Sequence, residues 1–206
     1  MQEIGGVPLV DRAIRILTEV EEIDHTILYG SCESILDYIS APTDTFKFIK
    51  RPIWLDDDAT TFNDILDSAL TFLDTDYIVF MTYTSPFIKP ETICKMIQVI
   101  KDGKHDSAFT ATSHNIFTWF NGEPLNYKLG DEIPKTQDLS PVLIETSSVY
   151  IFAKKYYEET GRRIGENPYI HIVDKIEGWD IDTMEDLKIA RRIADYLVLE
   201  GEINNG

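Results

Sequence analysis

Two aspartates near the carboxyl end of the chain, Asp180 and Asp182, have the spacing needed to bind one cation together. In an extended segment, side chains two residues apart project to the same side. Two carboxylates on one side can share a single hard cation, and a cation would screen their mutual repulsion. The residue types and their spacing therefore predict a metal site on this pair, with ordinary helix capping as the alternative.

The residues after the pair predict how it is positioned. Thr183 is a favoured helix N-cap, and Asp186 stands three residues later, as in a capping box. Apolar side chains then recur at helical spacing, so one face of this helix should pack on a sheet. Open α/β sheets bind ligands at the carboxyl ends of their strands, which is where we expect the pair. The apolar stripe comprises Leu187, Ala190, Ala194, Leu197 and Val198.

The composition indicates one acidic globular domain over residues 1–206. A hydrophobic content of 43% in 206 residues suffices for a single core. The net charge of -17 argues against a nucleic acid or an anionic membrane as partner, because both would repel such a surface. An acidic protein that binds an anionic small molecule needs a cation between the charges, and the aspartate pair could hold it.

Cysteine content and hydropathy predict a cytoplasmic setting. The two cysteines, Cys32 and Cys94, lie far apart in the sequence and lack the spacing of a zinc site. Neither a signal peptide nor an apolar run of about 18 residues is visible. We therefore expect no membrane association.

Strand and helix patterns alternate along the chain. Such alternation predicts a three-layer α/β/α sandwich with right-handed crossovers. Residues 77–81 are the clearest buried strand, because they form a nearly continuous apolar run. Asn121-Gly122 predicts a hairpin turn. The predicted strands are 26–29, 46–49, 77–81, 107–112, 143–152 and 169–173, and the predicted helices are about 8–22, 31–39, 61–73, 90–101, 154–160 and 183 onward.

Six segments occur in the order seen in one enzyme family. The chain resembles the acylneuraminate cytidylyltransferases, also called CMP-sialic acid synthetases. The resemblance implies a mostly parallel sheet of the nucleotide-diphospho-sugar-transferase type. It also implies transfer of CMP from CTP to a nonulosonic, sialic-type keto sugar acid, with pyrophosphate released and Mg²⁺ held by Asp180 and Asp182. The segments are 84–87, 106–109, 122–127, 137–141, 145–150 and 180–187.

The resemblance further implies a set of substrate-binding positions and a homodimer. The dimerisation arm would be about 154–173, although a plain surface loop is an equal alternative for this segment. The implied substrate positions are Thr84 and Ser85 beside the nucleotide, Gln137 and Asp138 near the sugar acid, and Thr146 and Tyr150 in the sugar pocket.

Two departures from the family pattern concern the phosphate groups of CTP. Family members begin with a central strand and a Gly-rich loop bearing Arg and Lys, whereas Met1 falls just after that point. The family also commonly has an arginine where this chain has Thr136. We therefore expect a sheet that lacks the usual first strand and loop.

Three hypotheses follow from this expectation. The chain is a shortened working enzyme, or a catalytically impaired member that serves as a structural or dimer partner. In the impaired version the sheet closes, so that strand 26–29 pairs with strand 77–81. A third hypothesis keeps the fold and makes the protein a glycosyltransferase that uses a nucleotide sugar. The position of the aspartate pair just before the final helix makes this third version the weakest.

Overall fold

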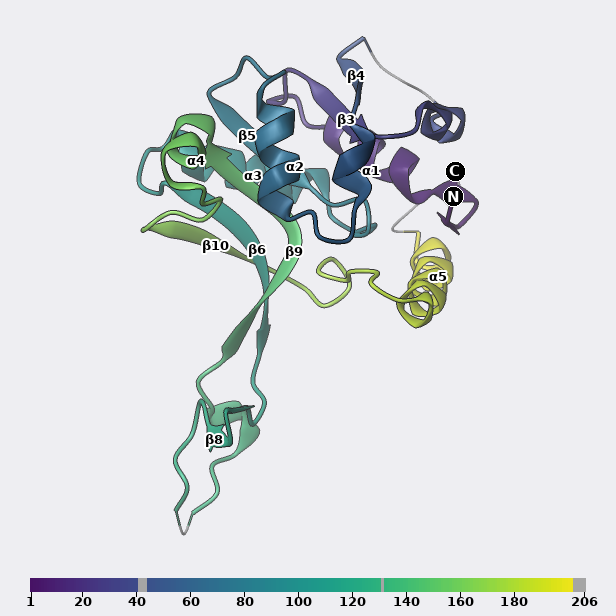
Figure 1. Ribbon diagram of the computed structural model, residues 1–206. Helices are drawn as coiled ribbons and strands as arrows, with labels where there is room; N and C mark the ends of the chain where they lie inside the picture. The colour runs from purple at the N-terminus through teal and green to yellow at the C-terminus, as the bar shows by residue number, and fades with distance from the viewer. Residues whose placement is uncertain (41–43, 131, 202–206) are drawn as a thin grey trace.

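A four-stranded sheet forms the centre of the computed structural model, which describes residues 1–40, 44–130 and 132–201 (Figure 1). Its strand order is β10-β6-β9-β5. β6 runs parallel to β10, and β9 runs antiparallel to both β5 and β6. Three of the four strands thus run in one direction, and their carboxyl ends meet at one edge of the sheet. The bounds are β5 Tyr77–Met81, β6 Ser107–His114, β9 Val142–Ala153 and β10 Pro168–Val173.

Helices cover both faces of this sheet, which confirms the predicted sandwich. α1 (Leu9–Thr18) and α3 (Pro90–Lys101) supply one hydrophobic cluster, together with Val149 and Ile151 of β9. α2 (Phe62–Leu70) and α4 (Lys154–Thr160) supply the cluster on the opposite face. Successive side chains of a strand point to opposite faces, so β9 contributes alternate residues to the two clusters.

The last helix, α5 (Met184–Leu199), packs against a short amino-terminal hairpin of β1 (Glu3–Ile4) and β2 (Val7–Pro8). Its capping box is present as predicted, since Thr183 and Asp186 bond each other's backbone N–H groups. The predicted stripe is buried at Leu187, Ala190, Ala194 and Leu197. The hairpin was not predicted, because strands of two residues carry no periodicity.

A second sheet contains only β3 (Thr26–Gly30) and β4 (Phe46–Lys50), which pair in parallel. Within the described residues, no backbone hydrogen bond joins β3 to β5. The predicted closure of strand 26–29 onto strand 77–81 is therefore wrong. Helix α2 contacts both strands, through Tyr29 and Phe80. A helix about 10 Å across spans roughly two inter-strand spacings, so it can hold the two strands apart with room for one strand between them.

The long strands β6 and β9 run out of the body as a twisted ribbon that carries residues 115–141 (Figure 1). The predicted hairpin at Asn121-Gly122 is confirmed, because both residues have the positive φ that this turn requires and join β7 (Trp119–Phe120) to β8 (Glu123–Pro124). We call residues 115–141 the arm. The segment 154–173, predicted as an arm, instead forms α4 and β10 within the body.

In the part of the chain that the structure describes, three short segments are 3₁₀ helices, at Glu33–Tyr38, Ile53–Asp56 and Thr136–Asp138. The first replaces the regular helix predicted at 31–39, and none of its residues is buried. A regular helix of that length is stabilised mainly by burying one face, and here no face is buried.

Candidate active site

The loop that carries the aspartate pair begins where β10 ends, and it turns sharply. Asp174 Oδ1 accepts hydrogen bonds from the N–H groups of Ile176 and Glu177, each at 2.8 Å. Gly178 N–H donates to the carbonyl oxygen of Asp174 at 2.9 Å. These bonds fold residues 174–179 back toward the sheet. We call residues 174–182 the acid loop.

The acid loop meets the turn that follows β5. Ile181 N–H donates to the carbonyl oxygen of Thr84 at 3.0 Å. Ser85 is completely buried, and its hydroxyl donates to Asp180 Oδ1 at 3.5 Å. A second hydrogen bond of 2.9 Å links the hydroxyls of Ser85 and Thr82. The structure thus brings together three predicted site residues, Thr84, Ser85 and Asp180, at the carboxyl ends of the parallel strands.

The aspartates have oxygens available for a cation. Asp180 Oδ1 also accepts from Ile181 N–H at 3.0 Å. No hydrogen bond or ion pair within the described residues engages the exposed carboxylate of Asp182. Helix capping falls to Thr183 and Asp186, at 3.2 Å and 2.8 Å, so the pair is not needed as a cap.

This donor set suits Mg²⁺. Among the described residues, no group of three or more His, Cys, Asp or Glu side chains could hold a metal ion. Mg²⁺ is typically held by one or two carboxylates plus substrate phosphates and water, rather than by a full protein cage. Asp180 and Asp182 therefore fit a cation that arrives with a nucleotide.

Thr146 lies beside the acid loop but turns its hydroxyl inward. It donates to the carbonyl oxygen of Thr110 at 3.1 Å, and the two hydroxyls are 2.7 Å apart. A methyl group added at Gly178 would lie 2.7 Å from Thr112 Cγ2 and 2.9 Å from Thr146 Cγ2. The loop therefore packs directly on β6 and β9, and only glycine allows that approach.

Tyr150, predicted for the same pocket, lies on the opposite face of the sheet. Ser147 has a φ of 58°, and the register between β6 and β9 shifts close by, which marks a β-bulge in β9. Because of this bulge, the side chains of Thr146 and Tyr150 point to opposite faces of the sheet. Tyr150 is 1% exposed, donates to Glu145, and accepts from Arg163 at 3.0 Å. Burial, aided by the hydrogen bond to Glu145, raises the pKa of Tyr150 to about 12. The hydroxyl is thus occupied inside the core.

Gln137 and Asp138 lie on the arm, in the 3₁₀ helix Thr136–Asp138. Both are exposed, and no hydrogen bond within the described chain joins either side chain to the acid loop. The 3₁₀ helix is held from within the arm, since Asn115 donates to the carbonyl oxygen of Leu139 at 3.0 Å. The structure does not bring these two positions to the aspartates.

Sequence reasoning missed Glu177, which is only 6% exposed although it is acidic. Its carboxyl group accepts from Lys89 N–H at 3.2 Å and from the hydroxyl of Thr92. The only signal in the sequence was an acid three residues before Asp180.

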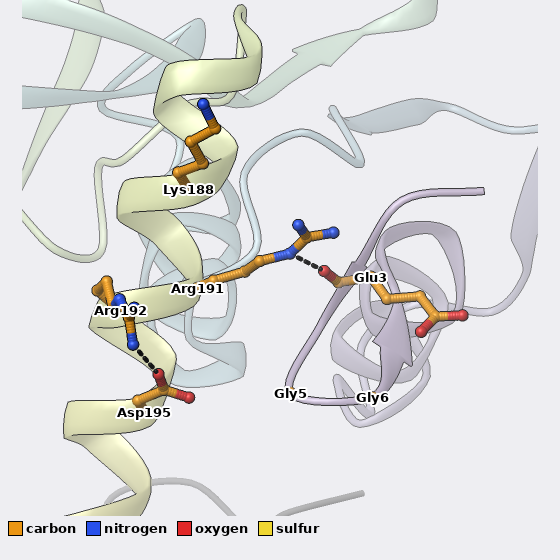
Figure 2. A pocket seen from close by; sticks show the side chains of 7 residues that line it. All are labelled: Glu3, Gly5, Gly6, Lys188, Arg191, Arg192 and Asp195. Carbon is orange, nitrogen blue, oxygen red and sulfur yellow. Dashed lines mark hydrogen bonds and ion pairs between the residues drawn. The ribbon is translucent and has the colours of Figure 1, made fainter.

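A separate cavity of about 520 Å³ lies between the β1–β2 turn and α5 (Figure 2). None of the predicted site residues lines it. Two of its three basic side chains have partners: Arg191 Nε donates to the carbonyl oxygen of Glu3 at 3.0 Å, and Arg192 lies 3.5 Å from Asp195.

Known proteins share this sequence pattern and fold. A family model described as cytidylyltransferase matches residues 1–156. The post-translational flagellin modification protein B of Campylobacter coli is 21% identical over 225 residues, covering 95% of this chain and 92% of that protein. Across the described residues, no helix has the length and apolar composition needed to cross a membrane.

Two solved structures have the same fold. The 4-diphosphocytidyl-2C-methyl-D-erythritol synthase of Anaerococcus prevotii superposes with a TM-score of 0.70 at 17% identity, covering 94% of this chain and 88% of that one. A CMP:2-keto-3-deoxy-manno-octonic acid synthetase in complex with CTP gives 0.66 at 12% identity, covering 94% and 90%.

Proposed function

Because this chain belongs to the cytidylyltransferase family, a family of enzymes, we propose that it transfers CMP from CTP to a nonulosonic, sialic-type keto sugar acid. The observation that carries this proposal is the contact of Ser85 with Asp180, where the turn after β5 meets the acid loop. That contact puts the aspartate pair and a polar turn at the edge where α/β sheets bind ligands. The solved keto-acid synthetase with CTP supports an acidic keto sugar as the acceptor.

The proposed reaction is an in-line displacement at phosphorus. A hydroxyl oxygen of the sugar acid forms a bond to the α-phosphorus of CTP. The bond from that phosphorus to the bridging oxygen breaks, and pyrophosphate leaves with the electron pair while the hydroxyl proton passes to water. Catalysis of this kind depends mainly on positioning and on neutralising charge.

The chain's own residues would hold the reactants in place. Asp180 and Asp182 would bind Mg²⁺, which when present supplies positive charge to the phosphate oxygens. Ser85, fixed by Thr82, would hold Asp180 in place through its hydrogen bond. The Thr84 carbonyl holds the loop by accepting from Ile181. Gln137, Asp138, Thr146 and Tyr150 lie on the arm or inside the sheet, so we base no step on them.

Release of pyrophosphate from CTP, Mg²⁺ and a panel of keto sugar acids tests the proposal. We expect release that depends on both the acid and the metal. Calorimetric titration with CTP and Mg²⁺ gives a second test, because a dissociation constant below about 1 mM would contradict the non-catalytic alternative. Absence of both binding and release would contradict the proposed reaction.

We also propose a homodimer, with its contact on the arm. Large apolar side chains concentrate on this projecting segment, where a second copy could cover them. Light scattering on a sizing column should show a dimer that Phe120→Asp dissociates, whereas Leu199→Asp, at the exposed end of α5, should leave the dimer intact. A wild-type monomer would contradict this proposal. The exposed arm side chains are Trp119, Phe120, Leu125, Leu129 and Ile133.

A further inference from the structure

Glu177 is a buried acidic side chain within the acid loop. A buried carboxyl group is costly unless hydrogen bonds replace its water. Lys89 N–H and the Thr92 hydroxyl supply two such bonds. Both donors lie at the amino end of α3, a part of the chain more than eighty residues away.

Helix α3 has no side-chain cap from its own N-cap residue. Lys89 is the N-cap residue, and its side chain makes no capping hydrogen bond. The amino end of a helix has unpaired N–H groups and a partial positive charge, both of which favour an acidic side chain. Glu177 thus caps α3 from the acid loop.

This cap is one of several contacts that fix the acid loop. Ile181, four residues after Glu177 and beyond Gly178 and Asp180, is hydrogen-bonded to Thr84. Gly178 packs on Thr112 and Thr146 without room for a side chain. The loop between Glu177 and Ile181 is therefore held at both ends and beneath, and Asp180 lies inside the held stretch.

We propose that Glu177 is a positioning residue for the metal site, which acts by anchoring the acid loop to the amino end of α3. With the anchor in place, Asp180 and Asp182 are presented together to one cation. Without it, the loop keeps the bonds of Ile181 to Thr84 and of Ser85 to Asp180, but the stretch before Gly178 loses its anchor and the pair binds metal weakly. This inference rests on the proposed metal role of the pair.

The test follows the Ile181 amide by NMR, in the full-length chain and during titration with MgCl₂ alone. In Glu177→Ala, we expect exchange of the Ile181 amide to accelerate about tenfold. The Mg²⁺ dissociation constant should rise at least about tenfold, as for other residues that orient metal ligands. Thr92→Val removes one donor without changing shape, and we expect the same changes at smaller size.

Two controls separate anchoring from loss of charge or of stability. Glu177→Gln keeps an oxygen that can accept both hydrogen bonds, so it should restore slow exchange and Mg²⁺ binding. Glu91→Ala removes an exposed acid from the same turn of α3 and should change neither readout. Unchanged exchange in Glu177→Ala and Thr92→Val, or equal acceleration of amides throughout β6 and β9, would overturn the anchor.

The two readouts also separate this inference from the proposed function. If MgCl₂ shifts no NMR signal of the wild-type chain, the metal role of the pair fails. The positioning role then fails with it, whatever the amide exchange rates show. If the wild type binds Mg²⁺ and Glu177→Ala binds it equally well, only the positioning role is overturned.

Discussion

At the scale of single residues, Asp182 is the side chain whose role can be tested with least disturbance. Its carboxylate is exposed and has no partner within the described chain, and capping is done by its neighbours. We expect Asp182→Asn to abolish Mg²⁺ binding while changing the free energy of unfolding by less than about 0.5 kcal/mol. Calorimetry with MgCl₂ and urea denaturation measure the two quantities. Glu185→Gln, an exposed acid of the next turn, is the control, and unchanged affinity in Asp182→Asn would refute the ligand role.

Tyr150 gives a prediction about alkaline pH. Its folded pKa of about 12, set mainly by burial, lies above the value near 10 expected in the unfolded chain. The stability that this group contributes is therefore complete below about pH 10 and is lost as the pH rises toward 12. We expect the wild type to lose more unfolding free energy than Tyr150→Phe between pH 8 and pH 11. Urea denaturation at both pH values measures this difference. Tyr196→Phe, an exposed position, should behave as the wild type does, and equal losses in all three proteins would contradict the prediction.

At the scale of elements, the sequence predicted helices and strands correctly where the local sequence signal was strong. The capping boxes at Thr61 and Thr183 confirm the predicted helix starts. The apolar run 77–81 forms β5 with the predicted bounds. The bulge at Ser147 could not be predicted, because a positive φ at a serine depends on pairing with a distant strand. That single bulge separates Tyr150 from Thr146, which the sequence had grouped.

A substitution at the start of α5 can distinguish helix capping from metal binding. Thr183→Ala removes the N-cap, and we expect it to lower the free energy of unfolding by about 1 kcal/mol. Mg²⁺ affinity should fall by less than about twofold, because the acid loop is held by Glu177 and Ile181 rather than by the cap. Thr61→Ala, at the equivalent cap of α2, should cost similar stability. Loss of Mg²⁺ binding in Thr183→Ala alone would show that the cap itself positions the pair.

At the scale of the whole molecule, the sequence predicted the layers but not the arm or the division of the strands into two sheets. Layers follow from periodicity, which each segment carries by itself. The arm depends on β6 and β9 continuing to pair beyond the body, a contact between residues far apart in sequence. The expected site residues Gln137 and Asp138 were separated from the aspartates for this reason.

The gap between β3 and β5 predicts how fast the backbone amides of these two strands exchange. In β5, Asp76 C=O and Thr82 N–H pair with β9, so the N–H groups of alternate residues, beginning with Tyr77, face away from it. In β3, Thr26 N–H and Gly30 C=O pair with β4 in the same way. The outward-facing amides have no backbone acceptor across the gap within the described residues, although α2 covers one face of both strands.

Amide exchange measured residue by residue should therefore alternate along both strands. We expect the gap-facing amides to exchange at least about 100-fold faster than their immediate neighbours, which share the same helix cover but donate to β4 or β9. Neighbouring residues are thus their own matched controls. Uniform protection along either strand would mean that a polypeptide strand occupies the gap in solution or that the two sheets join, and it would contradict an open edge. The fast set is Ile27, Tyr29, Val79 and Met81, and the slow set is Leu28, Ile78 and Phe80.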